Sequence, residues 1–147
     1  MADRLLDHCE RGKQGGGRPH RRRVDDSGGG GGMRVLVCGG RNFADHRKFS
    51  IRMDAVNEQY GPLQCVIEGG ASGADRMAWR WATKHFLPIE TYSADWKNHG
   101  RAAGPIRNER MLREGRPDLL VAFPGGRGTA NMVSLARAAG VRVIEVQ

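Results

Sequence analysis

The sequence predicts an α/β protein in which a mostly parallel sheet of about five strands is covered by helices on both faces. Short apolar and β-branched runs alternate along the chain with segments whose apolar residues recur at helical spacing. Three of the apolar runs end in glycine-rich turns, as buried parallel strands do. The chain has 147 residues, near the usual size of one domain, so we expect a single hydrophobic core.

The first predicted strand, Arg34–Cys38, stops at Gly39-Gly40. A helix is predicted over Ala44–Tyr60, with Asp45 as its N-cap and Gly61-Pro62 as its stop signal. Its inward stripe consists of Phe49, Met53 and Val56.

The second predicted strand, Cys65–Glu68, stops at Gly69-Gly70, and Asp75 opens the next helix. The apolar positions of that helix are Ala74, Met77, Ala78, Trp81 and Ala82. Because these positions fall at helical spacing, we expect Trp81 to belong to the core.

The second half of the chain repeats the alternation. The predicted elements are a short strand at Pro88–Tyr92, a helix over Gly104–Glu114, a strand at Asp118–Phe123, a helix over Thr129–Ala139 and a strand at Arg142–Val146. Pro105 falls in the first turn of its helix, where the missing N–H costs nothing.

Residues 1–32 are predicted to be a disordered Gly/Arg-rich extension, and residues 33–147 the functional domain. The extension holds nine of the 22 glycines, the cluster Arg21-Arg22-Arg23 and almost no large apolar residue, so it cannot offset the entropy of ordering. A tag, a linker and a wrongly assigned start codon are alternative origins for it.

The positive charge of the chain fits a phosphate-rich partner. The net charge is +8, and residues 33–147 hold 17 basic minus 11 acidic residues, or +6. Solvated arginines that bind nothing are the alternative. No apolar run reaches the length of a membrane span, and the amino terminus lacks the apolar core of a signal peptide. Cys38 and Cys65 lie in apolar runs, where a free cysteine acts as a small hydrophobic residue, so we expect a cytoplasmic protein.

Several ligand classes are disfavoured by the residues themselves. The five histidines are scattered, so no metal site is expected. The chain has no GxxxxGK[ST] motif, and the turn after the first strand does not read GxGxxG, which disfavours a P-loop NTPase and a dehydrogenase. No cofactor is identified.

Three glycine loops follow predicted strands and should meet at the carboxyl edge of the sheet, where open α/β sheets bind ligands. Glycines let backbone N–H groups approach an anion, and the following helix adds its positive end. The candidate phosphate-binding residues of these loops are Gly39, Gly40, Arg41 and Asn42; Gly69, Gly70, Ala71, Gly73 and Asp75; and Gly125, Gly126, Arg127, Gly128 and Thr129. Ordinary tight turns are the alternative for each loop.

Arg107 adds a further candidate ligand. It shares a helix face with Met111, so if Met111 packs inward, Arg107 lies near the inward side at the amino end of its helix. A phosphate would satisfy its guanidinium, and a pair with Asp75 or Asp118 is the alternative.

These motifs resemble the YspA/cpYpsA-related branch of the SLOG superfamily, which is named for the Smf/DNA-processing A and LOG proteins. The resemblance is carried by Gly39–Phe43, Gly69–Asp75, Ala94–Trp96, Gly104–Asn108 with Met111, and Phe123–Ala130. It implies a Rossmann-like three-layer sandwich, a nucleotide or nucleotide-derived ligand and, from the LOG proteins, a homodimer. It does not name the ligand.

Two groups of relatives imply different activities. LOG phosphoribohydrolases use P-G-G-x-G-T-x-x-E, and this chain has Met132 at the glutamate position, so their mechanism does not carry over intact. Asp75 or Asp95 would be the replacement acid, and a core role is the alternative for Met132. Met132→Glu should create or raise hydrolysis only if the rest of that active site is present.

DNA-processing A proteins bind single-stranded DNA and carry a pair matched by Arg107 and Asn108. Only Trp96 and Phe43 are aromatic near the expected edge, which favours a pocket for one nucleotide over a multi-base track. Trp96 is the base-stacking candidate, and a lid over the core is its alternative role. We therefore rank a nucleotide-binding sensor or processing module first, a nucleotide hydrolase second and single-strand binding third.

Overall fold

The computed structural model describes residues 32–147. The extension expected over residues 1–32 therefore lies, except for Gly32, outside the described residues. The elements in chain order are β1 (Met33–Cys38), α2 (His46–Tyr60), β2 (Leu63–Glu68), α3 (Ala74–Lys84), β3 (Ile89–Thr91), α4 (Trp96–His99), the 3-10 helix η1 (Gly100–Ala102), α5 (Ala103–Gly115), β4 (Leu119–Ala122), α6 (Arg127–Ala138) and β5 (Arg142–Glu145).

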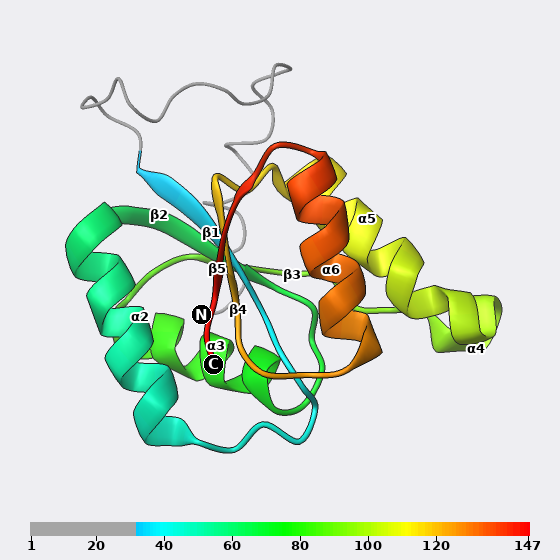
Figure 1. Ribbon diagram of the computed structural model, residues 1–147, viewed down its shortest axis with the longest axis horizontal. Coiled ribbons are helices and arrows are strands. Elements are labelled where there is room, and N and C mark those ends of the chain that lie inside the picture. Colours follow the sequence, from blue (N-terminus) through cyan, green and yellow to red (C-terminus); the bar gives the residue numbers. More distant parts are fainter. Residues whose placement is uncertain (1–31) are drawn as a thin grey trace.

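Five parallel strands form one sheet in the order β3-β2-β1-β4-β5 (Figure 1). β1 lies in the middle and pairs with β2 through Val35 and Val66, and with β4 through Val37 and Val121. β2 and β3 lie on one side of β1, and the chain then crosses back so that β4 and β5 lie on the other side. The expected parallel sheet of about five strands is confirmed.

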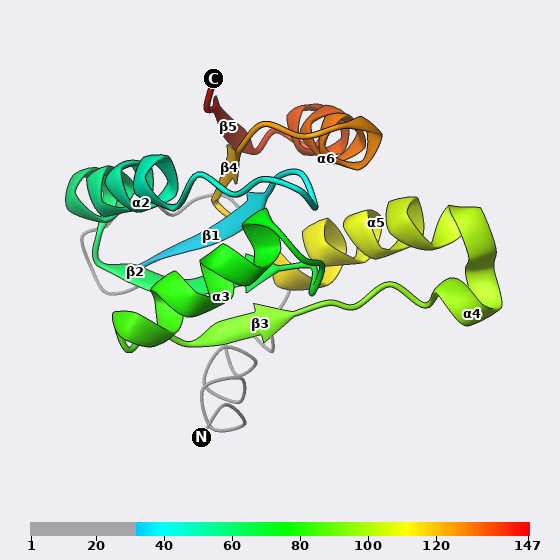
Figure 2. The ribbon, with the colours of Figure 1, turned by 90° about the horizontal axis from the view of Figure 1, so that it is seen from below.

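Helices cover both faces of the sheet, as expected. Figure 2 shows α2 and α3 on one face and α5 and α6 on the other. Alternate strand residues divide between the two faces: Val35 and Val37 pack with α2 and α3, whereas Leu36 packs with α5 and α6. This three-layer arrangement is Rossmann-like. No helix within residues 32–147 combines the length and apolar character that crossing a membrane requires.

The helix signals in the sequence act as predicted. Asp45 caps α2 by accepting a hydrogen bond from the backbone N–H of Lys48 at 3.0 Å. The inward stripe of α2 is buried, and Trp81 of α3 is 5% exposed. α6 begins at Arg127, two residues before the predicted start, which puts Thr129 in its first turn.

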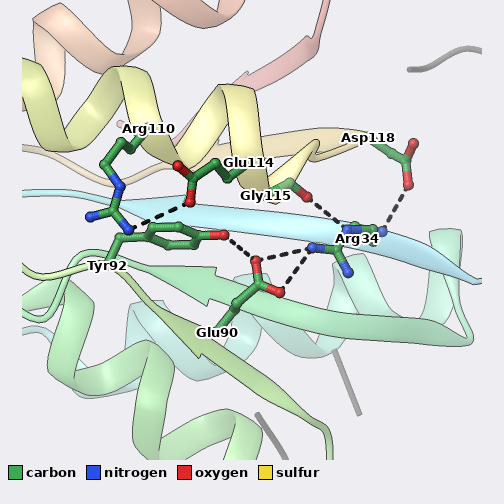
Figure 3. A network of polar contacts seen from close by, with 7 residues as sticks. All are labelled: Arg34, Glu90, Tyr92, Arg110, Glu114, Gly115 and Asp118. Atoms are coloured by element: carbon green, nitrogen blue, oxygen red, sulfur yellow. Dashed lines mark hydrogen bonds and ion pairs between the residues drawn. The ribbon is translucent and has the colours of Figure 1, made fainter. Parts of the chain in front are cut away.

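A buried polar network anchors the carboxyl end of α5 to the sheet (Figure 3). Arg34 of β1 donates from Nε to the Gly115 carbonyl oxygen at 2.7 Å and pairs with the Glu90 carboxylate at 3.1 Å. Tyr92 donates its hydroxyl hydrogen to the same carboxylate at 2.6 Å, and Arg110 lies over the Tyr92 ring. Since Arg34 and Glu90 are both nearly inaccessible, this network fixes where α5 lies.

Candidate functional site

The three glycine loops meet at the carboxyl edge of the sheet because β2, β1 and β4 are neighbours. Gly40 after β1 donates its N–H to the carbonyl oxygen of Pro124 after β4, at 2.9 Å. The carbonyl oxygen of Gly40 accepts from Ala74, at the start of α3, at 3.2 Å. The first loop therefore joins the other two.

Close backbone packing at this junction explains two of its glycines. A Cβ on Gly125 would lie 2.6 Å from the Gly40 nitrogen, and it would also collide with the Thr129 hydroxyl. Gly73 has φ +74° and its Cβ would meet the carbonyl oxygens of Gly40 and Arg41. The order of the strands reverses between β1 and β4, and in open α/β sheets that switch point is where ligands bind.

The loop after β2 is closed by two carboxylates. Glu68 accepts hydrogen bonds from the backbone N–H of Gly70 and the hydroxyl of Thr91, each at 2.5 Å. Asp75 accepts from the N–H of Ala71 at 3.1 Å. The N–H groups of Gly70 and Ala71 are therefore already bound to acidic side chains.

Burial makes both carboxyl groups weaker acids than exposed carboxyl groups. It raises the pKa of Glu68 to about 7 and that of Asp75 to about 6, against the stabilising effect of their hydrogen bonds. Arg107 partly opposes both shifts through its charge, and Arg41 partly opposes the shift at Asp75. The two carboxyl groups therefore titrate closer to neutral pH than ordinary carboxyl groups, as groups that transfer protons often do.

Arg107 lies beside the same loop. It donates to the carbonyl oxygen of Gly69 at 2.6 Å and to the Asn108 side chain at 3.0 Å. A Cβ on Gly69 would be 2.5 Å from an Arg107 guanidinium nitrogen and 3.0 Å from a carboxylate oxygen of Asp75, so both side chains converge on Gly69. The alternative pairing with Asp118 is wrong, because Asp118 accepts from the backbone N–H of Arg34 near the amino end of β1.

Asn108 connects α5 to α6. It is 4% exposed and donates from its amide nitrogen to the Asn131 side chain at 2.9 Å and to the Gly128 carbonyl oxygen at 3.3 Å. Its own oxygen accepts from Arg107. Asn108 thus aligns the first turn of α6 with Arg107.

The first turn of α6 has no internal acceptor for its N–H groups. Gly126 is its N-cap and offers no side-chain hydrogen bond, and no acidic residue lies in the first turn. Arg127, Gly128 and Thr129 form that turn, and a Cβ on Gly126 or Gly128 would meet only open space. A pocket of about 560 Å³ adjoins it, lined by residues that include Pro124, Gly125, Thr129 and Glu145.

The two aromatic candidates differ. Phe43 packs on Phe123 with ring centroids 5.4 Å apart and belongs to the core margin. Trp96 is 48% exposed, and the Arg41 guanidinium lies over its ring at 5.3 Å. The Asp95 side chain caps α4 by accepting hydrogen bonds from Asn98, and these bonds lower the pKa of the Asp95 carboxyl. In this position Asp95 supports the helix start.

Sequence reasoning missed Glu68 and Asn131. The sequence predicts Glu68 only as the last residue of a strand, and its position just before Gly69-Gly70 is the available signal. Asn131 lies on α6 and contributes only through its contact with Asn108, which no local pattern reveals. Within residues 32–147, no group of three or more histidines, cysteines or acidic residues is arranged to hold a metal ion.

Comparison with known proteins identifies the family. A model of the YspA, cpYpsA-related SLOG family matches residues 33–99. The gene 61 protein of Mycobacterium phage D29 is 38% identical over 120 residues, which cover 76% of this chain and 94% of that protein. The chain belongs to the YspA, cpYpsA-related SLOG family. Membership supports a nucleotide-related role in general terms.

Among solved structures, this SLOG protein is similar to glycinamide ribonucleotide transformylase 1 from Symbiobacterium toebii. The TM-score is 0.46 with 16% identity, over 77% of this chain and 50% of that chain. The SLOG chain thus spans half the length of that structure.

The glutamate position of LOG enzymes is part of the core in this SLOG protein. Met132 is fully buried among Leu36, Leu120 and their neighbours. Because a glutamate at this position would place its carboxylate in the apolar core, we expect Met132→Glu to destabilise the fold. Glu68 and Asp75 are the buried acids at this edge.

Proposed function

We propose that this protein binds a nucleotide or nucleotide derivative, with a phosphate at the first turn of α6. The observation that carries the proposal is the difference between two loops at one edge. The N–H groups of Gly70 and Ala71 donate to carboxylates, whereas the first turn of α6 begins without a side-chain cap or an acid and carries Arg127 and Thr129. A phosphate is stabilised by such a helix end.

The loop after β2 suits the sugar in this proposal. A carboxylate at the loop, such as Asp75, repels phosphate but accepts hydrogen bonds from ribose hydroxyls. Arg107 lies between the two parts of the site, tied to Gly69 directly and to α6 through Asn108. The proposed ligand therefore lies across the switch point, with its phosphate toward α6 and its sugar toward α3.

The test is the melting temperature of the full chain against AMP, ADP, ADP-ribose, NAD and cyclic nucleotides. A ligand at about 100 times its dissociation constant adds roughly 2.7 kcal/mol to the free energy of unfolding, a shift of several degrees. Thr129→Val, which removes only the hydroxyl, and Arg127→Ala should each reduce the shift.

Arg52→Ala is the matched charge control, because Arg52 is exposed on α2. It should leave the shift unchanged. Shifts that persist in the Thr129 and Arg127 variants would contradict the proposed phosphate site. Binding of single-stranded DNA with a steep fall in affinity as salt rises would instead support an extended electrostatic track.

A second candidate function, hydrolysis of the bound nucleotide, is favoured by the buried carboxyls Glu68 and Asp75. Burial raises the pKa of Glu68 to about 7 and that of Asp75 to about 6, so near neutral pH Glu68 can act as an acid and Asp75, mostly ionised, as a base. Water would add across the N-glycosidic or phosphate bond. Asp75→Asn should then abolish release of free base or phosphate while retaining most of the binding. If the wild-type chain binds a ligand and leaves it intact, the hydrolase is excluded for that ligand.

A further inference from the structure

The segment that contains Trp96 stands apart from the body of the protein. No residue of α4 or η1 is buried, and Figure 2 shows α4 well clear of the sheet. The packing of α4 involves η1 and α5, elements next to it in the chain. Elements with so few buried contacts open at low free energy.

Trp96 nevertheless has a defined place. Its ring reaches α5, where a Cβ on Gly104 would lie 3.5 Å from the ring edge. The side chain of Asp95 fixes the start of α4 by accepting from both the backbone and the side chain of Asn98. The ring is therefore held near the amino end of α5, the helix that carries Arg107 three residues later.

The Arg41 side chain, from the loop after β1, covers a face of the ring. Its guanidinium carbon is 5.3 Å from the Trp96 ring centroid. The backbone of Arg41 is fixed to the loop after β2, because its carbonyl oxygen accepts from the Ser72 hydroxyl at 3.2 Å. The same guanidinium acts electrostatically on Asp75 and on Arg107. The contact between Arg41 and Trp96 thus bridges the first loop and α4, next to the proposed sugar position.

A planar cation on an indole face marks a surface that also stacks nucleobases, since both use the π face of the ring. The other aromatic ring near the edge, Phe43, is occupied by Phe123. Phe123 is a core residue and cannot leave Phe43, whereas Trp96 is half exposed and only the flexible Arg41 side chain lies over its face, so a base can replace Arg41 there.

We propose that Trp96 forms a nucleobase subsite, in which the base stacks on the ring face that Arg41 covers in this structure. This inference rests on the proposed function, because it assumes the phosphate at α6. The ligand class is then a nucleotide with an aromatic base, and a sugar phosphate without a base is a poor ligand. When the base binds, the Arg41 side chain swings aside within reach of the ligand's negative charge.

The experiment is calorimetric titration of the full chain with ribose 5-phosphate and with AMP, GMP, CMP and UMP. Stacking of one base on an aromatic side chain is expected to favour the best nucleotide over ribose 5-phosphate by about tenfold or more. Trp96→Ala should remove that preference and leave the affinity for ribose 5-phosphate within about twofold, while Trp96→Phe should keep most of it.

Trp79→Ala is the matched control, because Trp79 is a 38% exposed tryptophan on α3 and the ring that Arg41 covers is that of Trp96. It should behave as wild type. Circular dichroism of each variant shows whether the fold is intact, and Trp96→Phe keeps the test valid if Trp96→Ala unfolds.

The outcomes separate the two proposals. Equal affinity of the wild-type chain for nucleotides and ribose 5-phosphate, or an unchanged preference in Trp96→Ala, overturns the base subsite but leaves the phosphate site standing. Nucleotide binding that is lost in Trp96→Ala but insensitive to Thr129→Val overturns the phosphate site alone. Failure of every compound to bind wild type contradicts both.

Discussion

Gly40 donates its backbone N–H to the carbonyl oxygen of Pro124 at 2.9 Å, so the loop after the central strand is bonded to the loop that begins α6. The bond sits where the strand order reverses. Two loops more than 80 residues apart in sequence thereby form one wall of the candidate site.

Gly125→Ala should destabilise the chain and weaken ligand binding, because its Cβ would push against the Gly40 nitrogen and the Thr129 hydroxyl. Overpacking of this kind costs about 1 to 3 kcal/mol, measurable by urea unfolding. Gly128→Ala is the control for stability alone, since its Cβ meets open space and alanine favours a helix by up to about 1 kcal/mol. Similar losses in both variants would contradict the packing described.

Asn108→Ala should cost about 1 to 3 kcal/mol, because it removes the buried hydrogen bonds that the Asn108 side chain makes with Asn131 and Arg107. It should also weaken nucleotide binding, since α6 is no longer aligned with Arg107. A double-mutant cycle with Asn131→Ala checks this. If the two side chains interact, the double variant should lose less stability than the sum of the losses in the two single variants. Full additivity would show that the contact contributes nothing.

Glu90→Ala should be among the most damaging substitutions, because it leaves the Arg34 charge in a buried place without its carboxylate. Breaking a buried pair typically costs about 3 to 5 kcal/mol. The Arg137 and Glu145 pair is shorter, at 2.8 Å, but both side chains are about half exposed, so Arg137→Ala should cost at most about 1 kcal/mol. Thermal unfolding of both variants tests this ranking, and a larger loss for the exposed pair would contradict it.

The pH dependence of stability should reflect Glu68. Burial raises its pKa from 4.5 to about 7, so the folded chain binds this proton more tightly than the unfolded chain. Its contribution to the free energy of unfolding is therefore greatest below about pH 4.5 and is lost as pH rises toward 7. Glu68→Gln should remove that decline, a change on the order of 2 kcal/mol between pH 5 and 8.

Denaturant unfolding at several pH values measures the decline. Glu58→Gln, at an exposed position on α2, is the control and should keep the wild-type profile. If Glu68→Gln keeps it as well, the Glu68 carboxyl is not the group responsible.

Most of the fold was predictable because its signals are local. Apolar runs that end in glycine, the Asp45 cap and the Phe49, Met53 and Val56 stripe each depend on a few neighbouring residues. α4 was missed, since four residues without a buried side chain leave no periodicity to detect. The position of Trp96 at the start of α4 was therefore visible only in the structure.

The sequence predicted where the candidate site lies, but not which of its backbone N–H groups are left to bind a ligand. Gly69, Gly70 and Ala71 match a phosphate loop in sequence, but the carboxylates that take the N–H groups of Gly70 and Ala71 are visible only in three dimensions. Arg107 was expected near the edge, yet its bond to the Gly69 carbonyl depends on how α5 packs, which the distant Arg34 network helps to fix.

The central claim is that a nucleotide phosphate binds at the first turn of α6, and amide chemical shifts measured during titration with AMP test it most directly. The account predicts saturable shifts that are largest at Gly126, Arg127, Gly128 and Thr129 and that inorganic phosphate reproduces in part. Shifts confined to other parts of the chain, with these four amides unmoved at saturation, would contradict it.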